Sequence, residues 1–214
     1  MCRSLLFTAL LLSSCSTKIK MEVDLGKVSE SEKFHELLNE EWNKGIVENP
    51  EWATRLGDNR FNDKLNDASF EMILERHDDS RTLLQKVELI DRSDLDKEDQ
   101  LNYDLYINRI KQSIEGYAFQ SYLMPIDQMG GIQIGFAGIS SYMPFKSKKD
   151  YNNYLSRLKA FPEKVSQTID LMIRGSDSGW LPPKIVLSAV PEQISSQFNA
   201  PLDESPLFEP FKEF

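Results

Sequence analysis

The sequence predicts an all-α fold, an array of many helices with one long, ordered, glycine-rich loop between them. Apolar residues recur every three or four positions through most of residues 29–214, which is the period of an amphipathic helix. Helix-capping residues stand at the start of several of these segments. The loop is set apart by its composition, because residues 123–145 hold four of the chain's ten glycines.

The first helix is expected to start at Ser29, which can form a capping box with Glu32, and to end near Asn49–Pro50. Its apolar face should pack into a core, whereas its polar face begins with His35 and points to solvent. The apolar face comprises Phe34, Leu37, Leu38 and Trp42.

This helix contains the stretch FHELLNEEW (residues 34–42), which begins like the H-E-x-x-H helix of zinc proteases. Asn39 stands where the second histidine would be, and His35 lies on the solvent side of the helix. The chain's other histidine, His77, lies on an apolar stripe, where we expect a hydrogen-bonded position at the edge of a core. We therefore expect neither histidine to bind a metal ion.

Two more helices are predicted in the first half of the chain. One runs from about Ser69 to Ile90, and a longer one follows Asp94, where clustered acidic residues suit the positive end of a helix. The longer helix carries an aromatic and aliphatic stripe at helical spacing, which is typical of core packing rather than of cofactor binding. The stripe comprises Tyr103, Tyr106, Ile107, Ile110, Ile114 and Tyr117.

In the second half, Ser147 and Asp150 are predicted to cap the start of another long helix. Pro162 is expected to kink this helix or split it in two, and Gly175 to cap its end. Pro182–Pro183 suits the first turn of a last helix.

The glycine-rich loop at residues 123–145 is too apolar to extend into water, so we expect it to pack against the helices or to line a cleft. The residues that we predict at such a substrate cleft are Gln128, Gly130 and Gly131. The Gly-Gly-x-x-x-Gly pattern lacks the lysine of a phosphate-binding loop, so nucleotide binding is not expected.

The first 15 residues have the layout of a bacterial lipoprotein signal peptide. An apolar run at residues 5–12 is too short to span a bilayer, and Leu12-Ser13-Ser14-Cys15 resembles a lipobox. We expect Cys15 to be lipidated and to tether the protein to a membrane of the cell envelope, periplasmic or outer, through a flexible segment at residues 16–28. The alternative is an ordinary signal peptide whose cleavage leaves a free cysteine.

Charge and cysteine content exclude two further classes of protein. The formal net charge is −9 and the sequence has no basic stripe, so nucleic acid is not an expected partner. Cys2 would be lost with the signal peptide, which leaves Cys15 alone. The mature chain can then form neither an internal disulfide nor a cysteine-based zinc site.

Several segments, in order, resemble the amino-terminal half of the bacterial family known as domain of unknown function 885. The resemblance covers nearly all of residues 45–214. It rests on NPEWATRLGDNRFND, DQLNYDLYINRI, PIDQMGGIQIGF, MPFKSKKDYNNYLSRL, IRGSDSGWLPPKIVLSAVPEQI and SPLFEPF.

This resemblance implies a largely helical protein, usually more than twice as long, that is allied to zinc metallopeptidases. The metal site of the family is expected in its carboxy-terminal half, in a stretch that reads like His-Glu followed by Pro-Gly-His. Neither His35 nor His77 matches such a stretch, so no catalytic residue and no zinc are expected in this chain.

Three readings follow for residues 29–214. In the first, they are the helical amino-terminal part of a shortened, lipid-anchored, zinc-peptidase-like protein, whose helices wall a substrate cleft and pack against the missing carboxy-terminal half. In the second, the chain is a naturally short, non-catalytic lipoprotein that binds peptides or a protein partner. In the third, it is a structural envelope protein without a ligand. In each of them, we expect no hydrolase activity from this chain alone.

Overall fold

The computed structural model describes residues 28–212, and the regular structure in this range is entirely helical, which confirms the predicted all-α fold. Short 3₁₀ turns connect the helices, and no helix in this range is both long and apolar enough to cross a membrane. The α-helices are α1 (Glu30–Glu48), α2 (Pro50–Arg55), α3 (Phe70–Glu88), α4 (Lys97–Gly116), α5 (Ile132–Gly135), α6 (Lys148–Ser178), α7 (Lys184–Leu187) and α8 (Val190–Asn199).

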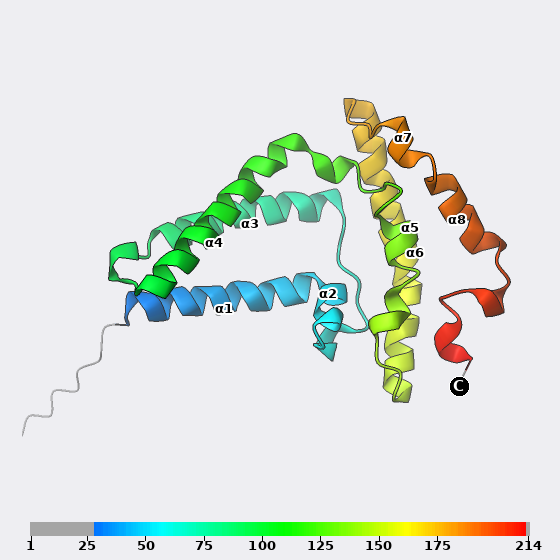
Figure 1. Ribbon diagram of the computed structural model, residues 1–214, viewed down its shortest axis with the longest axis horizontal. Helices are drawn as coiled ribbons and strands as arrows, with labels where there is room; N and C mark the ends of the chain where they lie inside the picture. Colours follow the sequence, from blue (N-terminus) through cyan, green and yellow to red (C-terminus); the bar gives the residue numbers. More distant parts are fainter. Residues whose placement is uncertain (1–27, 213–214) are drawn as a thin grey trace, which may run out of the picture.

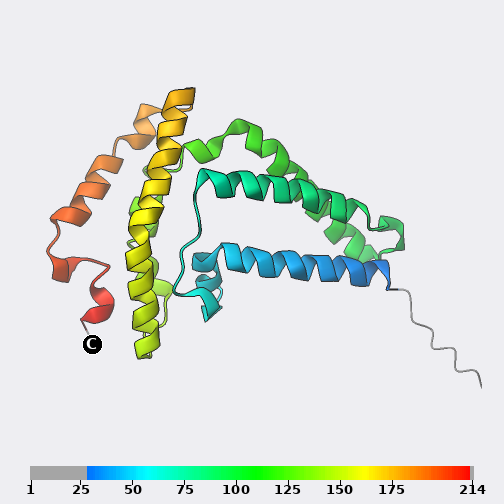
Figure 2. The same cartoon turned by 180° about the vertical axis from the view of Figure 1, so that it is seen from behind.

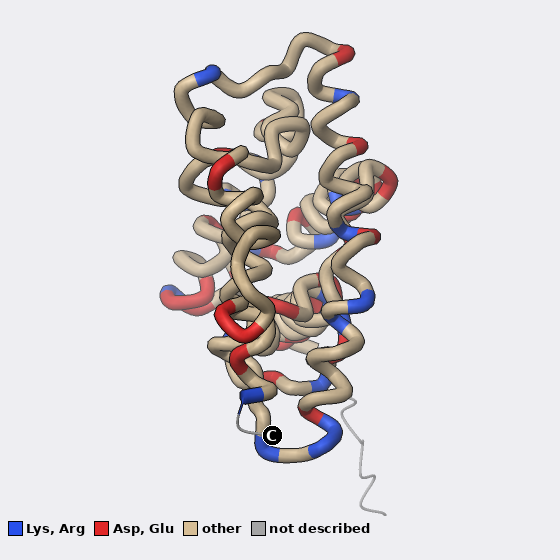
Figure 3. Tube along the Cα trace, turned by 90° about the vertical axis from the view of Figure 1, so that its right-hand side faces the viewer, with Lys and Arg blue, Asp and Glu red and all other residues tan. Residues whose placement is uncertain are grey.

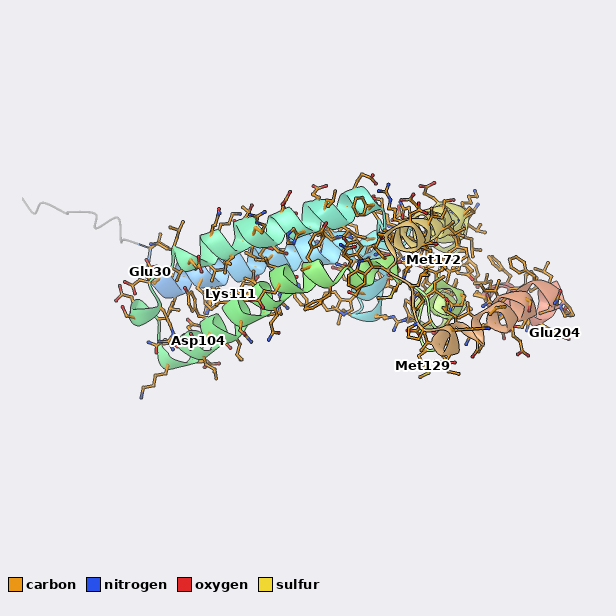
Figure 4. All side chains as sticks on the ribbon, turned by 90° about the horizontal axis from the view of Figure 1, so that it is seen from above. Glu30, Asp104, Lys111, Met129, Met172 and Glu204 are labelled. Atoms are coloured by element: carbon orange, nitrogen blue, oxygen red, sulfur yellow. The ribbon has the colours of Figure 1, made fainter. Side chains whose placement is uncertain are left out.

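Helices α1, α3 and α4 lie side by side as one unit, and the long helix α6 crosses beside the end of this unit (Figure 1, Figure 4). The short α2 stands at the junction between α1 and α6 (Figure 1). Helices α7 and α8 run back along the other side of α6, and α5 contacts α8 (Figure 2). Lysine and arginine positions are interspersed with acidic ones along the described chain (Figure 3).

Serine side chains cap the starts of three helices, and two of these caps, at Ser29 and Ser147, were predicted. The Ser29 hydroxyl accepts a hydrogen bond from the backbone N–H of Glu32, whose carboxylate accepts one from the N–H of Ser29 at 2.8 Å. Ser147 and Asp150 make the same reciprocal pair at the start of α6. The Ser69 hydroxyl caps α3. These caps satisfy backbone donors that a helix start would otherwise leave without a partner.

One apolar core fills the space between α1, α3 and α4. Phe34 and Val87 are fully buried, and the ring centroids of Phe34 and Tyr103 lie 5.8 Å apart. Ile110, one further position on the stripe predicted for α4, is also buried. The aromatic stripe therefore packs this core, as predicted.

A second core joins α6 to the glycine-rich loop. The rings of Phe136 and Phe161 stack with their centroids 3.6 Å apart, and Ile139 and Tyr154 are buried beside them. The Tyr154 hydroxyl donates a hydrogen bond to the carbonyl oxygen of Leu207 at 2.8 Å. The loop is thus ordered by packing on α6, in short helical turns rather than in one continuous coil.

The side chain of Arg157, on α6, is fully buried and ties this helix to the segment around α2. Its Nε donates a hydrogen bond to the carbonyl oxygen of Lys64 at 2.8 Å. Its Nη2 donates to the hydroxyl of Thr54 at 2.7 Å and to the carbonyl oxygens of Pro50 and Phe61 at 3.0 and 3.3 Å. Burial lowers the pKa of this guanidinium, because the charged form loses its hydration.

A helix that was not predicted, α2, follows α1 directly. The predicted end of α1 near Asn49–Pro50 is confirmed, and Pro50 also occupies the first turn of α2, where its missing N–H costs nothing. The turn between the two helices brings Trp52 beside Trp42, with ring centroids 5.2 Å apart. Trp42 was expected on a buried face, yet it lies beyond the core and is 54% exposed.

The end of α6 was predicted wrongly. Gly175 does not cap this helix; the left-handed cap is Gly179, with φ of 79°. Of the two effects expected at Pro162, a split does not occur, because α6 continues through this residue. Gly175 lies inside the helix, where a Cβ would come within 2.8 Å of the carbonyl oxygen of Leu123 and 2.9 Å of that of Trp180. A glycine is needed there because two backbone segments approach the helix closely.

The predicted last helix is divided in two. Pro183 stands directly before α7 rather than in its first turn, and α7 ends at Leu187, whereas α8 begins only at Val190. Pro191, in the first turn of α8, has no N–H to continue the hydrogen-bond ladder of α7. The missing donor accounts for the break.

Part of α6 presents apolar side chains to solvent. Ile169 is 49% exposed and Ile173 is 53% exposed, with Met172 beside them. Their spacing of three and four residues places them on one face of the helix. The apolar side chains of this helix are therefore only partly buried within residues 28–212, with Tyr154 and Leu171 inside and these three residues outside.

The Arg157→Met variant is expected to unfold more easily than the wild type by about 3 kcal/mol, because it leaves several buried acceptors without a donor. Urea unfolding followed by circular dichroism measures this change. The matched control is Arg60→Met, which removes an exposed guanidinium paired with Asp58 and should cause a much smaller loss. Equal losses in the two variants would contradict a clamp at Arg157.

Candidate functional site

A cleft opens where the glycine-rich loop meets α2 and α6. Its volume is about 330 Å³, which lies within the range of small-ligand sites. Gly131 and Gly135 line it from the loop side, Glu51 and Arg55 from α2, and Lys164 from α6.

One wall of the cleft is apolar. The stacked rings of Phe136 and Phe161 lie only 9° from parallel, and Ile132 and Ile139 line the cleft beside them. Stacked rings packed in a core hold a fixed shape, so this wall offers a firm apolar surface.

The other wall is polar and held by paired groups. Lys164 bonds to the carboxylate of Glu51 and to the side-chain oxygen of Asn66, and the lysine and glutamate side chains are only 16% and 20% exposed. The second carboxylate oxygen of Glu51 accepts the backbone N–H of Asn66 at 2.9 Å. The Arg55 guanidinium lies 4.3 Å from the ring centroid of Tyr142. Two cations and one anion therefore line this cleft.

Backbone geometry fixes the glycines of the loop. The carboxylate of Asp127 accepts hydrogen bonds from the N–H groups of Met129 and Gly130 at 2.6 and 2.7 Å, which closes a tight turn. Gly131 follows with φ of 120°, a value that other residues rarely adopt. A Cβ on Gly131 would lie 2.4 Å from the side-chain oxygen of Gln133.

A set of glutamine side chains attaches the loop to α8. The amide of Gln193 donates to the carbonyl oxygen of Gln128 at 3.0 Å, and the amide of Gln133 donates to the side-chain oxygen of Gln193 at 3.3 Å. The amide of Gln197 donates to the carbonyl oxygen of Gln133. The N–H of Gln128 donates a hydrogen bond to the carbonyl oxygen of Val186 on α7 at 2.8 Å, so the loop is bonded to both α7 and α8.

Of the three loop residues predicted at a substrate cleft, Gly131 lines the cleft. Gly130 lies in the turn closed by Asp127, and the carbonyl oxygen of Gln128 accepts a hydrogen bond from Gln193 on α8. Cys15 lies outside the described residues. The polar wall around Glu51 and Lys164 was not predicted, because the two residues are 113 positions apart and no local motif joins them.

The two histidines take different roles. As expected, His35 is exposed on the polar side of α1, and its Nε2 lies 2.7 Å from a carboxylate oxygen of Asp99 on α4. This hydrogen bond is the main cause that lowers the pKa of Asp99. His77 stacks on Tyr117, with ring centroids 4.0 Å apart. Within residues 28–212, no three His, Cys, Asp or Glu side chains are grouped so that they could hold a metal ion.

Comparison with known protein families gives a match over residues 50–214 to the family described as "Bacterial protein of unknown function (DUF885)". The chain belongs to this family. Comparisons with curated proteins and with solved structures gave no match. The DUF885 match begins at Pro50, the first residue of α2, so every residue that lines the cleft beside Gly131 lies within it.

Gly131→Ala is expected to lower the unfolding free energy of the DUF885 chain by about 2 kcal/mol, because alanine is strained at this φ and its methyl group would displace Gln133. Thermal unfolding followed by circular dichroism measures the change. Gly135→Ala is the control in the same cleft, since it has open space around its Cβ position. If both variants melt like the wild type, the loop is not held as the structure indicates.

Proposed function

We propose that this DUF885 chain is a lipid-anchored protein of the cell envelope that binds peptides in the cleft beside Gly131 and is not a hydrolase on its own. The observation that carries the proposal is the cleft itself, in which a firm apolar wall faces a paired polar wall. The lipobox at Cys15 supports the anchor, and the resemblance to zinc-metallopeptidase-like proteins supports a peptide as ligand.

The lining of the cleft suits a short peptide. Apolar side chains of a peptide can pack on Phe161 and its partner, while backbone amides meet Glu51 and Asn66. The lining carries one more positive than negative charge, and Arg55 is exposed, so a carboxylate group on the peptide is favoured. A guanidinium binds a carboxylate with two parallel hydrogen bonds.

The chain has only two histidines, the side chains that most often hold a catalytic zinc ion. A catalytic zinc site needs three protein ligands, commonly with two or three histidines among them. The described chain uses His35 in a hydrogen bond to Asp99 and His77 in a stack on Tyr117. In this proposal, zinc and the hydrolytic groups belong to the carboxy-terminal half that the family resemblance implies.

The exposed stripe on α6 supports a larger assembly in the same proposal. Ile169, Met172 and Ile173 form an apolar surface of a kind that soluble proteins usually cover. A carboxy-terminal half packed on α6 would bury these side chains and stand next to the cleft that Lys164 lines from the same helix.

Peptide binding is tested with the full chain in detergent micelles and fluorescein-labelled hexapeptides, by fluorescence anisotropy. A peptide with a free carboxy-terminal carboxylate should bind more tightly than its amidated form. Arg55→Gln should weaken the free acid about tenfold, the loss of one charge-assisted pair, and leave the amidated form unchanged. Arg60→Gln, with its exposed arginine on Asp58, is the control. Equal affinity for both peptides, or no binding of either, would show the proposal to be wrong.

Lipid anchoring is tested in cells that express the whole chain. Cys15→Ser should abolish incorporation of labelled palmitate and move the protein from the membrane fraction to the soluble fraction, because no acyl chain can then be attached. Cys2→Ser is the matched control, and it should leave both measurements unchanged. Unaltered labelling in Cys15→Ser would refute the anchor, whereas the peptide cleft is judged by the anisotropy measurement alone.

A further inference from the structure

A second and larger cleft lies between α1, α3 and α4, close to α2. Its volume is about 590 Å³, within the range of about 300–1,000 Å³ that is typical of small-molecule sites. Figure 4 shows these three helices side by side, with side chains between them. Glu51 and Trp52, which are neighbours on α2, line different clefts.

Two tryptophans form an open aromatic corner in this second cleft. Trp42 on α1 is 54% exposed, and Trp52 on α2 is 43% exposed. Their ring planes meet at 69°, so the edge of one indole faces the other ring and much of the aromatic surface stays in contact with water. Indole is the largest apolar side chain, and an exposed pair at the mouth of a cleft marks a surface that a ligand can cover.

The charged groups of the second cleft are balanced and largely paired. Lys44 bonds to Asp79, and its Nζ lies 3.8 Å from Oε1 of Glu48. The other carboxylate oxygen of Glu48, Oε2, accepts a hydrogen bond from Nε of Arg76 at 3.2 Å. Arg109 stands over the ring of Tyr106, 5.2 Å from its centroid. The lining includes three cations (Lys44, Arg76 and Arg109) and three acids (Glu41, Glu48 and Asp79).

This balance decides which ligand fits. A phosphate or another strong ion would meet as much repulsion as attraction among the six charged groups, so it would gain little. A neutral ligand with many hydroxyl groups can donate to the carboxylates and accept from the cations without changing the net charge. Because the ion pairs hold these side chains in place, the ligand need not order them on binding.

The tryptophan corner adds a second requirement. The ligand must also have a face of C–H groups, because partly positive hydrogens are attracted to the negative face of an indole ring. Sugar rings in the pyranose form meet both requirements, with C–H groups on their faces and hydroxyls around their edge. We propose that the cleft between α1, α3 and α4 binds a short neutral oligosaccharide, with sugar rings against Trp42 and Trp52. This site is separate from the proposed peptide cleft, so either proposal can fail alone.

The test is isothermal titration of the full chain, in detergent micelles, with two neutral probes, N,N′,N″-triacetylchitotriose and maltotriose. At least one should bind saturably, with a Kd of about 1 mM or tighter. Trp42→Ala and Trp52→Ala should each weaken this binding at least about tenfold, while Trp42→Phe keeps part of it because a smaller aromatic face remains. Trp180→Phe, at the third tryptophan of the chain, is the matched control and should bind like the wild type.

Two further measurements distinguish sugar binding from a loss of folding and from ionic attraction. Circular dichroism melts of the Trp42 and Trp52 variants show whether each still folds, and only folded variants enter the comparison. Affinity should change little between about 50 and about 500 mM salt, because the ligand is neutral. Failure of both probes to bind, equal binding by the wild type and both alanine variants, or binding that falls steeply with salt would each overturn the proposal.

Discussion

The buried guanidinium of Arg157 is the constraint on which the arrangement of the chain depends. It lies inside α6, and its donors reach carbonyl oxygens at Pro50, Phe61 and Lys64, so the segment around α2 is fixed against α6. Lys164 lies seven residues further along α6, which puts it on the same face two turns away. Its bond to Glu51 joins α6 to α2, the same two elements that Arg157 holds together. The polar wall of the cleft therefore lies on the interface that the clamp fixes.

Local sequence patterns were sufficient to predict the fold class, the main helices and several of their first residues. The caps at Ser29 and Ser147 depend on side chains within three residues, and the stripe of α4 repeats at helical spacing. The burial of Arg157 could not be predicted in the same way, because an arginine in an amphipathic helix normally lies on the solvent-exposed face. Its acceptors come from residues 93 to 107 positions earlier, and no short pattern connects them.

The wrong prediction at Gly175 and the prediction at Gly131 have the same physical origin. A glycine permits a left-handed turn or a close approach of backbone, and the sequence does not say which of the two is used. At Gly175 the structure uses close approach, while the neighbouring Gly179 supplies the left-handed cap, so the predicted helix end fell four residues early. Gly131 was placed at a cleft because its whole loop is apolar and rich in glycine, a signal that extends over many residues. Glu51 and Lys164, which line the opposite wall of that cleft, have no comparable pattern around them in the sequence.

Helix α2 separates two surfaces with different origins. The cleft beside Gly131 is built wholly from residues in the DUF885 match, so its shape is determined by the part of the chain shared with the family. The cleft with Trp42 takes one wall from α1, which ends before the match begins, and the other walls from α2, α3 and α4. Loss of α1 would remove Trp42 and Lys44 from the second cleft and uncover the core around Val87, but it would leave the Arg157 clamp intact. The two clefts are thus separable in sequence although they meet at adjacent residues of one short helix.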